Sequence, residues 1–295
     1  MDSLSHKEKE ERAAKLIHQG KLADAKLIYH QLIADGTRNH ITYCNLATIY
    51  GIEGEVDQLI EFLSKALEIE PNFPEALYNL GLALTKKGQD SEAIDLYKKA
   101  LAIKDDQPVI YYNLANIFQL RGDLNAAIAA YKQAINFNPS YAEAHNNLGI
   151  ALEAQGDLIS AINSYSTALE LRPDYPEAFN NLGNASKKSG NSSAAIAAYQ
   201  KAIELSPSDP ETYSNLGNAF KDLGNLDLAI SSYKKALDCN QNFAEAHYNL
   251  GNSYWEIGEI APAISSFKSA LSIKPNYSSA QQNLSMVELL SGDYE

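Results

Sequence analysis

The feature that most constrains this chain of 295 residues is a pattern that returns every 34 residues. The dipeptide Asn-Leu marks it at Asn45, Asn79, Asn113, Asn147, Asn181, Asn215, Asn249 and Asn283, with no insertion between them. A glycine series, which includes Gly88 and Gly122, and an alanine series keep the same interval. Internal repeats of this length are typical of stacked arrays. We call the eight asparagines the asparagine ladder.

Each interval predicts two helices, as residues 74–107 illustrate. Pro74 suits the first turn of a helix, where its missing N–H needs no partner, and Gly88 ends that helix. The first helix carries an apolar stripe at helical spacing, at Leu77, Leu80, Gly81 and Leu84. The second helix carries its own stripe, at Ala93, Ile94, Tyr97, Ala100 and Leu101. Because no repeat can bury its stripes alone, we expect the array to be stabilised mainly by contacts between repeats.

One position in the first helix holds a residue with little or no side chain. It is glycine at Gly81, Gly149, Gly183, Gly217 and Gly251, and Ala47, Ala115 or Ser285 in other repeats. A small residue lets a neighbouring helix approach closely. We expect large side chains four positions earlier, such as Phe179 and Tyr213, to fill the space beside it.

Together these positions resemble the tetratricopeptide repeat (TPR) family. The resemblance implies an all-α fold, a right-handed superhelix (α-solenoid) of antiparallel helix pairs. It covers seven regular 34-residue repeats over 40–277. Residues 1–39 are predicted to be a degenerate N-terminal repeat or cap, because Arg12 and Lys26 occupy apolar positions. Residues 278–295 are predicted to be the first helix of a further, truncated repeat.

The first helices of such an array line its concave inner wall, and the ladder asparagines lie opposite the apolar stripe. A side-chain amide both donates and accepts hydrogen bonds, so a row of amides can pair with an extended peptide backbone. The alternative is a structural role, in which the amides tie adjacent helices together. Both roles can coexist.

The predicted peptide-binding groove combines amides with aromatic side chains. Its amides are Asn79, Asn113, Asn116, Asn147, Asn181, Asn184, Asn215, Asn218, Asn249 and Asn252. Its aromatic residues are Tyr78, Tyr112, Tyr248 and Trp255, which fall outside the apolar stripe. Large aromatic side chains are frequent hot spots of binding.

The dense amides of residues 142–277 also resemble the superhelical recruitment arm of O-linked N-acetylglucosamine transferases, in which ladder asparagines hold the substrate's backbone. Two functions follow. The first is a non-catalytic interaction scaffold that binds an extended peptide or protein segment in its groove. The alternative is the substrate-recruiting arm of a glycosyltransferase whose catalytic domain is absent from this chain, as in bacterial proteins that fuse TPR arrays to glycosyltransferases.

Other classes of function lack their sequence signals. No phosphate-binding glycine-rich loop, His-Glu-x-x-His site or Cys-x-x-Cys pair occurs, so we predict no enzyme, no cofactor and no metal. The net charge of −13 disfavours nucleic acid and anionic membrane surfaces as partners. No apolar run is long enough to insert into a membrane, and two distant cysteines suit a reducing compartment. We therefore expect a cytoplasmic protein that binds a protein or peptide segment.

The last predicted helix, from Ser278 to Leu290, remains apolar on the face that should end the array. Its apolar residues are Leu284, Met286, Val287, Leu289 and Leu290. A terminal helix of a solenoid ordinarily presents a polar outer face. We therefore expect either a fragment of a larger TPR protein or a close relative that lost its catalytic half. The exposed apolar end also predicts end-to-end self-association of copies.

Overall fold

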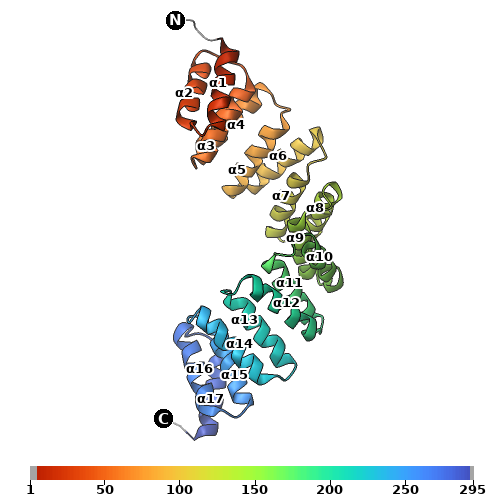
Figure 1. Cartoon of the computed structure of the whole chain (residues 1–295), viewed down its shortest axis with the longest axis vertical. Helices are drawn as coiled ribbons and strands as arrows, with labels where there is room; N and C mark the ends of the chain where they lie inside the picture. The colour runs from red at the N-terminus through yellow and green to blue at the C-terminus, as the bar shows by residue number, and fades with distance from the viewer. Residues whose placement is uncertain (1–4, 293–295) are drawn as a thin grey trace. The chain divides into compact units, whose positions relative to one another are not determined.

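The structure, a computed structural model, describes residues 5–292 (Figure 1). This part of the chain contains seventeen α-helices and no strand. The chain divides into two units, one that ends at Pro139 and one that begins at Ser140. The first unit holds α1 (His6–His18), α2 (Leu22–Ala34), α3 (His40–Ile52), α4 (Val56–Ile69), α5 (Pro74–Lys86), α6 (Asp90–Ile103), α7 (Pro108–Leu120) and α8 (Leu124–Phe137). The second unit holds α9 (Ala142–Gln155), α10 (Leu158–Leu171), α11 (Pro176–Lys188), α12 (Ser192–Leu205), α13 (Pro210–Asp222), α14 (Leu226–Cys239), α15 (Ala244–Glu256), α16 (Ile260–Ile273) and α17 (Ser278–Ser291).

Consecutive helices pack as pairs within each unit. In the first unit α3 packs on α4 and α5 packs on α6, and in the second α11 packs on α12 and α13 on α14. The second helix of one pair also packs on the first helix of the next, as α4 does on α5 and α12 does on α13. This stacking is that of an α-solenoid, so the predicted all-α fold of paired helices is confirmed.

A glycine turn joins the two helices of a pair. Gly88 follows α5 with a φ of +74°, and Gly122 follows α7 with a φ of +78°. No heavy atom beyond the glycine and its two chain neighbours lies within 4 Å of the place where a Cβ would stand on either residue. The left-handed backbone conformation, and not a lack of space, therefore calls for glycine here.

The core of most pairs is an aromatic ring of the second helix that lies on the small residue of the first. A Cβ added to Gly217 of α13 would lie 2.5 Å from the Cε1 atom of Tyr233 of α14, and Tyr233 is fully buried. The same arrangement joins Gly81 with Tyr97, Gly149 with Tyr165, Gly183 with Tyr199, and Gly251 with Phe267. The glycine thus makes room for a ring from the helix that follows it.

The expectation that Phe179 and Tyr213 fill the space beside these glycines is wrong. Phe179 is half-buried and packs instead on Ala168 and Leu169 of α10, the second helix of the preceding repeat. Tyr213 is half-buried too, with the Lys235 amine 5.9 Å from its ring centroid. Phe179 therefore contacts the second helix of the preceding repeat, whereas Gly183 meets Tyr199 of the second helix of its own repeat.

Candidate peptide-binding surface

The predicted groove residues all lie on the first helices of their repeats. In the first unit they are Tyr78 and Asn79 of α5, and Tyr112, Asn113 and Asn116 of α7. In the second unit they are Asn147 of α9, Asn181 and Asn184 of α11, Asn215 and Asn218 of α13, and Tyr248, Asn249, Asn252 and Trp255 of α15.

Some ladder asparagines bond to the first helix of the preceding repeat. The Asn181 amide Nδ2 donates to Asn146 Oδ1 at 3.1 Å, and the Asn215 amide Nδ2 donates to Asn180 Oδ1 at 3.3 Å. Each bond spans 35 residues, so the acceptor stands just before the previous ladder asparagine. These amides tie first helices together, which is the structural role left open by the sequence. An amide that donates one N–H still has a second N–H.

Other ladder asparagines bond to a core tyrosine of the preceding second helix. Asn45 Nδ2 donates to the Tyr29 hydroxyl at 3.1 Å. Asn113 makes a side-chain hydrogen bond with Tyr97, sixteen residues earlier like the first pair. The core rings therefore connect the ladder to the interior of the repeat.

The asparagines one turn after the ladder accept hydrogen bonds from the core tyrosines of their own repeats. The donor–acceptor distances are 2.6 Å for Tyr131 to Asn116, 2.7 Å for Tyr199 to Asn184 and 2.7 Å for Tyr233 to Asn218. Where the ring is Phe267 and has no hydroxyl, Asn252 Oδ1 instead accepts from Asn283 Nδ2 at 2.7 Å. These asparagines are thus part of the core network as well as of the surface.

Two ladder asparagines have no such bond. The side-chain amides of Asn79 and Asn249 make no hydrogen bond to any group of residues 5–292. The residue 35 positions earlier is Cys44 for Asn79 and Ser214 for Asn249, where Asn181 and Asn215 find an amide. Burial raises the pKa of the Cys44 thiol to about 11, so that sulfur stays protonated and is a weak acceptor. Asn79 is exposed and Asn249 half-buried.

The predicted aromatic contacts lie closer to the core than expected. Tyr78 lies against Tyr97 and Tyr112 against Tyr131, with ring centroids 6.2 and 6.0 Å apart. Tyr248 lies 6.0 Å from the ring of Phe267. The idea that these tyrosines stand apart from the core is therefore wrong, because each half-buried ring covers a buried one.

Ion pairs link the carboxyl-terminal ends of first helices in the second unit. Lys188 bonds to Glu153 at 2.7 Å, and Lys221 pairs with Glu256 at 2.6 Å. The Lys221–Glu256 pair borders a cavity of 320 Å³ that Asn252 and Trp255 also line. Trp255 is half-buried and lies about two turns beyond the unbonded Asn249 on α15. This end of α15 therefore offers an amide, a large ring and charge together.

The core hydroxyls remain protonated well above neutral pH. Burial is the main cause that raises the pKa of Tyr165, Tyr199 and Tyr233, and the nearby carboxylate of Glu153 adds to it for Tyr165. The neutral phenol donates the hydrogen bonds to Asn184 and Asn218. These tyrosine hydroxyls therefore act as hydrogen-bond donors at physiological pH.

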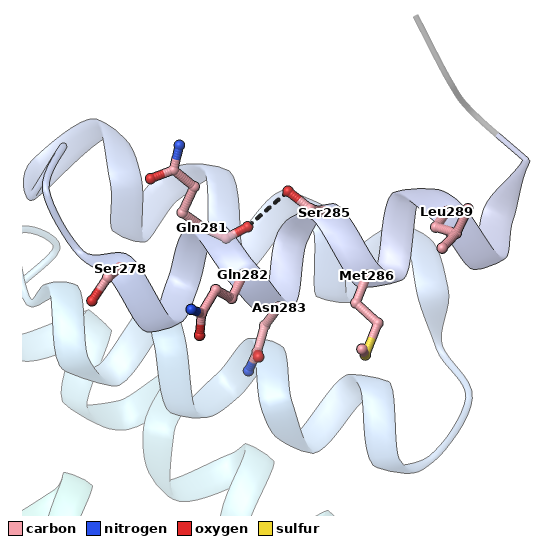
Figure 2. Close-up of a pocket in the computed structure, with 7 residues that line it drawn as sticks. All are labelled: Ser278, Gln281, Gln282, Asn283, Ser285, Met286 and Leu289. Carbon is pink, nitrogen blue, oxygen red and sulfur yellow. Dashed lines mark hydrogen bonds between the residues drawn. The ribbon is translucent and has the colours of Figure 1, made fainter.

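A further hollow lies on α17 (Figure 2). Its volume is 780 Å³, and Ser278, Gln281, Gln282, Asn283, Ser285, Met286 and Leu289 line it. Met286 and Leu289 are each 55% exposed and Leu290 is 65% exposed. The Ser285 hydroxyl donates to the Gln281 carbonyl, as the dashed line in Figure 2 marks. Met286, Leu289 and Leu290 are therefore uncovered, as the sequence predicts, whereas Leu284 and Val287, which the sequence groups with them, pack against Phe267.

Signals of other sites are absent from the described part of the chain. Residues 5–292 contain no cluster of three or more His, Cys, Asp or Glu side chains arranged to hold a metal ion. Nor does any helix among them have the length and apolar character needed to cross a bilayer.

Stacked helix pairs with a polar row on the first helices define the chain as a helical-repeat protein. Family comparison then names the repeat. The family described as "TPR repeat" matches residues 49–88, 81–120, 115–156, 153–190, 184–224 and 217–258, and "Tetratricopeptide repeat" matches 244–277. The chain belongs to the tetratricopeptide repeat family. No curated protein sequence matches it significantly.

Solved structures show the same fold. The chain is similar to MamA, with 29% identity over 58% of this chain and 94% of MamA and a TM-score of 0.54. It is also similar to YrrB, described as "a TPR protein with an unusual peptide-binding site", with 25% identity over 63% of this chain and 96% of YrrB and a TM-score of 0.55. A tetratricopeptide repeat protein from Parabacteroides merdae, 20% identical over 85% of this chain and 99% of its own length, shares the fold at a TM-score of 0.62.

Proposed function

We propose that this chain is a scaffold whose first helices bind an extended peptide or protein segment through ladder amides. The observation that carries the proposal is the pair of ladder asparagines, Asn79 and Asn249, whose amides are unbonded while their neighbours are engaged. An amide held in place by its helix, with both donor and acceptor available, suits a peptide bond of a ligand. The likeness to YrrB supports a peptide as the ligand.

In the same proposal, the aromatic residues of the groove contact side chains of the ligand beside the ladder amides. Trp255 and Asn252 border one cavity on α15, where a side chain of the ligand can pack while its backbone meets Asn249. Tyr78 and Tyr248 are half-buried, so their rings are fixed in place before a ligand arrives. A rigid aromatic surface binds at low entropic cost.

The test separates ligand-binding asparagines from structural ones. Peptides selected from a phage-displayed library of random peptides serve as the probe, and their affinity is measured by fluorescence anisotropy. Asn79→Ala and Asn249→Ala are each expected to weaken the peptides bound at their own site roughly tenfold, with unfolding unchanged, because only a bond to the ligand is lost. Asn225→Ala, at an exposed asparagine before α14, is the control and should change neither quantity.

Asn181→Ala is expected to do the reverse. It removes the donor to Asn146, which is 4% exposed, and leaves that buried amide oxygen without its partner. The cost is about 1–3 kcal/mol of unfolding free energy, seen as an earlier midpoint in urea. Equal loss of affinity from Asn181→Ala and Asn249→Ala, or none from either Asn79→Ala or Asn249→Ala, would refute the assignment.

The same row of amides supports a second candidate, the recruiting arm of a glycosyltransferase. In that role the groove would deliver a peptide substrate to a catalytic domain on the same polypeptide. A reading frame that continues past Glu295 into a transferase domain would support this candidate, and one that ends there would refute it.

The uncovered side of α17 supports end-to-end association of copies. We expect the weight-average mass in sedimentation equilibrium to rise with concentration for the wild type. Replacing the exposed pair by Leu289→Gln and Leu290→Gln removes apolar surface that such a contact would bury, and should keep the chain monomeric. A wild type that stays monomeric at every concentration contradicts the association.

A further inference from the structure

One repeat in the first unit lacks the aromatic ring of the others. The ring position is aromatic at Tyr29, Tyr97, Tyr131, Tyr165, Tyr199, Tyr233 and Phe267. In the pair α3 and α4 it holds Leu63, which is buried, and Ala47 replaces the glycine opposite. A leucine is shorter than a tyrosine, so the space at the far end of the ring is left for something else.

A cavity of 290 Å³ lies where the tip of the missing ring belongs. In other repeats the tyrosine hydroxyl reaches the residues three and six positions after the ladder asparagine, as Tyr131 does to Asn116 and Gln119 at 2.6 and 2.9 Å. The equivalent residues here are Thr48 and Gly51, and both line the cavity. Its remaining walls are Ile52, Val56, Leu59, Leu63, Asn79, Leu82, Ala83 and Lys86. We call this space the ring cavity.

The ring cavity opens on the surface that holds the unbonded Asn79. Gly51 and Asn79 are exposed, and Ile52 is 60% exposed. At the position sixteen residues earlier, where Asn45 and Asn113 find a tyrosine hydroxyl, Asn79 has Leu63. An occupant of the cavity thus meets apolar walls and an available amide at once.

A cation stands beside the cavity. Lys86 forms no ion pair within residues 5–292, whereas the adjacent Lys87 bonds to Asp57 at 2.6 Å. Elsewhere in the first unit, lysine amines lie over aromatic rings, with Lys26 4.0 Å from the Tyr50 centroid. A ring placed in the cavity would receive the same favourable contact from Lys86.

We propose that the ring cavity is an anchor site for one aromatic side chain of the bound peptide, phenylalanine or tyrosine. The occupant replaces the ring that the repeat lacks, and the backbone beside it pairs with the Asn79 amide. A tyrosine adds a hydroxyl at the place where Tyr97 and Tyr131 carry theirs. The net charge of −13 favours neutral or basic residues on either side of the aromatic one. This inference rests on the proposed function and names the chemistry of its ligand.

The test fills the cavity without disturbing the fold. Gly51→Gln places at this position the residue that Gln119 supplies in the repeat of α7 and α8. A Cβ on Gly51 would lie 3.7 Å from the Leu59 methyl carbons, which is ordinary contact, so the variant is expected to fold. Ala154→Gln adds the same side chain at an exposed residue of α9 and serves as the matched control. Circular dichroism and urea unfolding establish that both variants are folded.

A phage-displayed library of random 12-residue peptides is the probe, selected in parallel on the wild type and both variants. We expect the wild type and Ala154→Gln to enrich peptides with one Phe or Tyr and no excess of acidic residues. Gly51→Gln should lose the aromatic enrichment. In a selected peptide, Phe→Ala should weaken binding to the wild type at least tenfold and to Gly51→Gln less than twofold.

The outcomes distinguish the anchor from the wider proposal. Selected peptides without an aromatic residue, or aromatic enrichment that survives Gly51→Gln, would overturn the anchor and leave peptide binding intact. A library that yields no binding peptide on the wild type would overturn both.

Discussion

Gly217→Ala is expected to lower the unfolding free energy by about 2 kcal/mol, although alanine is ordinarily the better residue within a helix. The added Cβ would stand 2.5 Å from Cε1 and 2.8 Å from Cδ1 of Tyr233. That ring is fully buried between helices, so the new Cβ fits only if the packed side chains and helices shift. Overpacking costs about 1–3 kcal/mol and outweighs the roughly 1 kcal/mol that alanine gains in helix propensity. Urea unfolding followed by circular dichroism measures the change.

The control is Gly51→Ala in α3, where the new Cβ would be 3.7 Å from Leu59. Here we expect no loss, or a gain of up to about 1 kcal/mol. A second substitution should relieve the overpacking, because Tyr233→Leu added to Gly217→Ala recreates the natural combination of Leu63 with Ala47. The double variant should be more stable than the sum of the two single changes predicts. If Gly217→Ala stabilises the chain as Gly51→Ala does, the packing account is contradicted.

Alkaline pH is expected to unfold the chain steeply once it passes about 10. Burial raises the pKa of Tyr165, Tyr199 and Tyr233 in the folded state, so folding favours the neutral phenol. Unfolded tyrosines ionise near pH 10. The stabilisation is therefore complete below pH 10 and is lost as pH rises above it. These three tyrosines, at about 1.4 kcal/mol per pH unit each, contribute about 4 kcal/mol per unit to the slope, and Tyr29 and Tyr97, whose pKa burial also raises, add to it.

The measurement is urea unfolding at pH values from 8 to 11, with tyrosinate absorbance recorded alongside. The double variant Tyr199→Phe and Tyr233→Phe is the control, because Phe267 occupies the same position in its own repeat. It removes two of the buried phenols, so the slope should fall by about 2.8 kcal/mol per pH unit. An equal slope in both proteins would show that groups other than Tyr199 and Tyr233 cause the loss of stability at alkaline pH.

The fold could be predicted from the repeat alone. A fixed interval with apolar stripes at helical spacing leaves paired helices as the arrangement that buries both stripes. The partner of the small residue could not be read in the same way. Gly217 meets Tyr233, sixteen residues later on the next helix, and spacing within α13 carries no information about that contact.

The sequence predicts where the candidate surface lies, but not which of its amides form hydrogen bonds. Sequence alone places Asn181 and Asn249 at equivalent positions, whereas the structure bonds the first and leaves the second unbonded. The difference lies in the residue 35 positions earlier, Asn146 in one case and Ser214 in the other. Likewise, the sequence shows Leu63 at a position that is otherwise aromatic, but only the structure shows the ring cavity that results.

Contact between a bound peptide and the unbonded ladder amides of the first helices can be observed directly. The most direct measurement is nuclear magnetic resonance of a chain labelled with ¹⁵N at asparagine, before and after addition of a library-selected peptide. We expect the side-chain amide signal of Asn79, Asn249 or both to shift, while that of Asn225 stays in place. A bound peptide that leaves both ladder amides unshifted would contradict it.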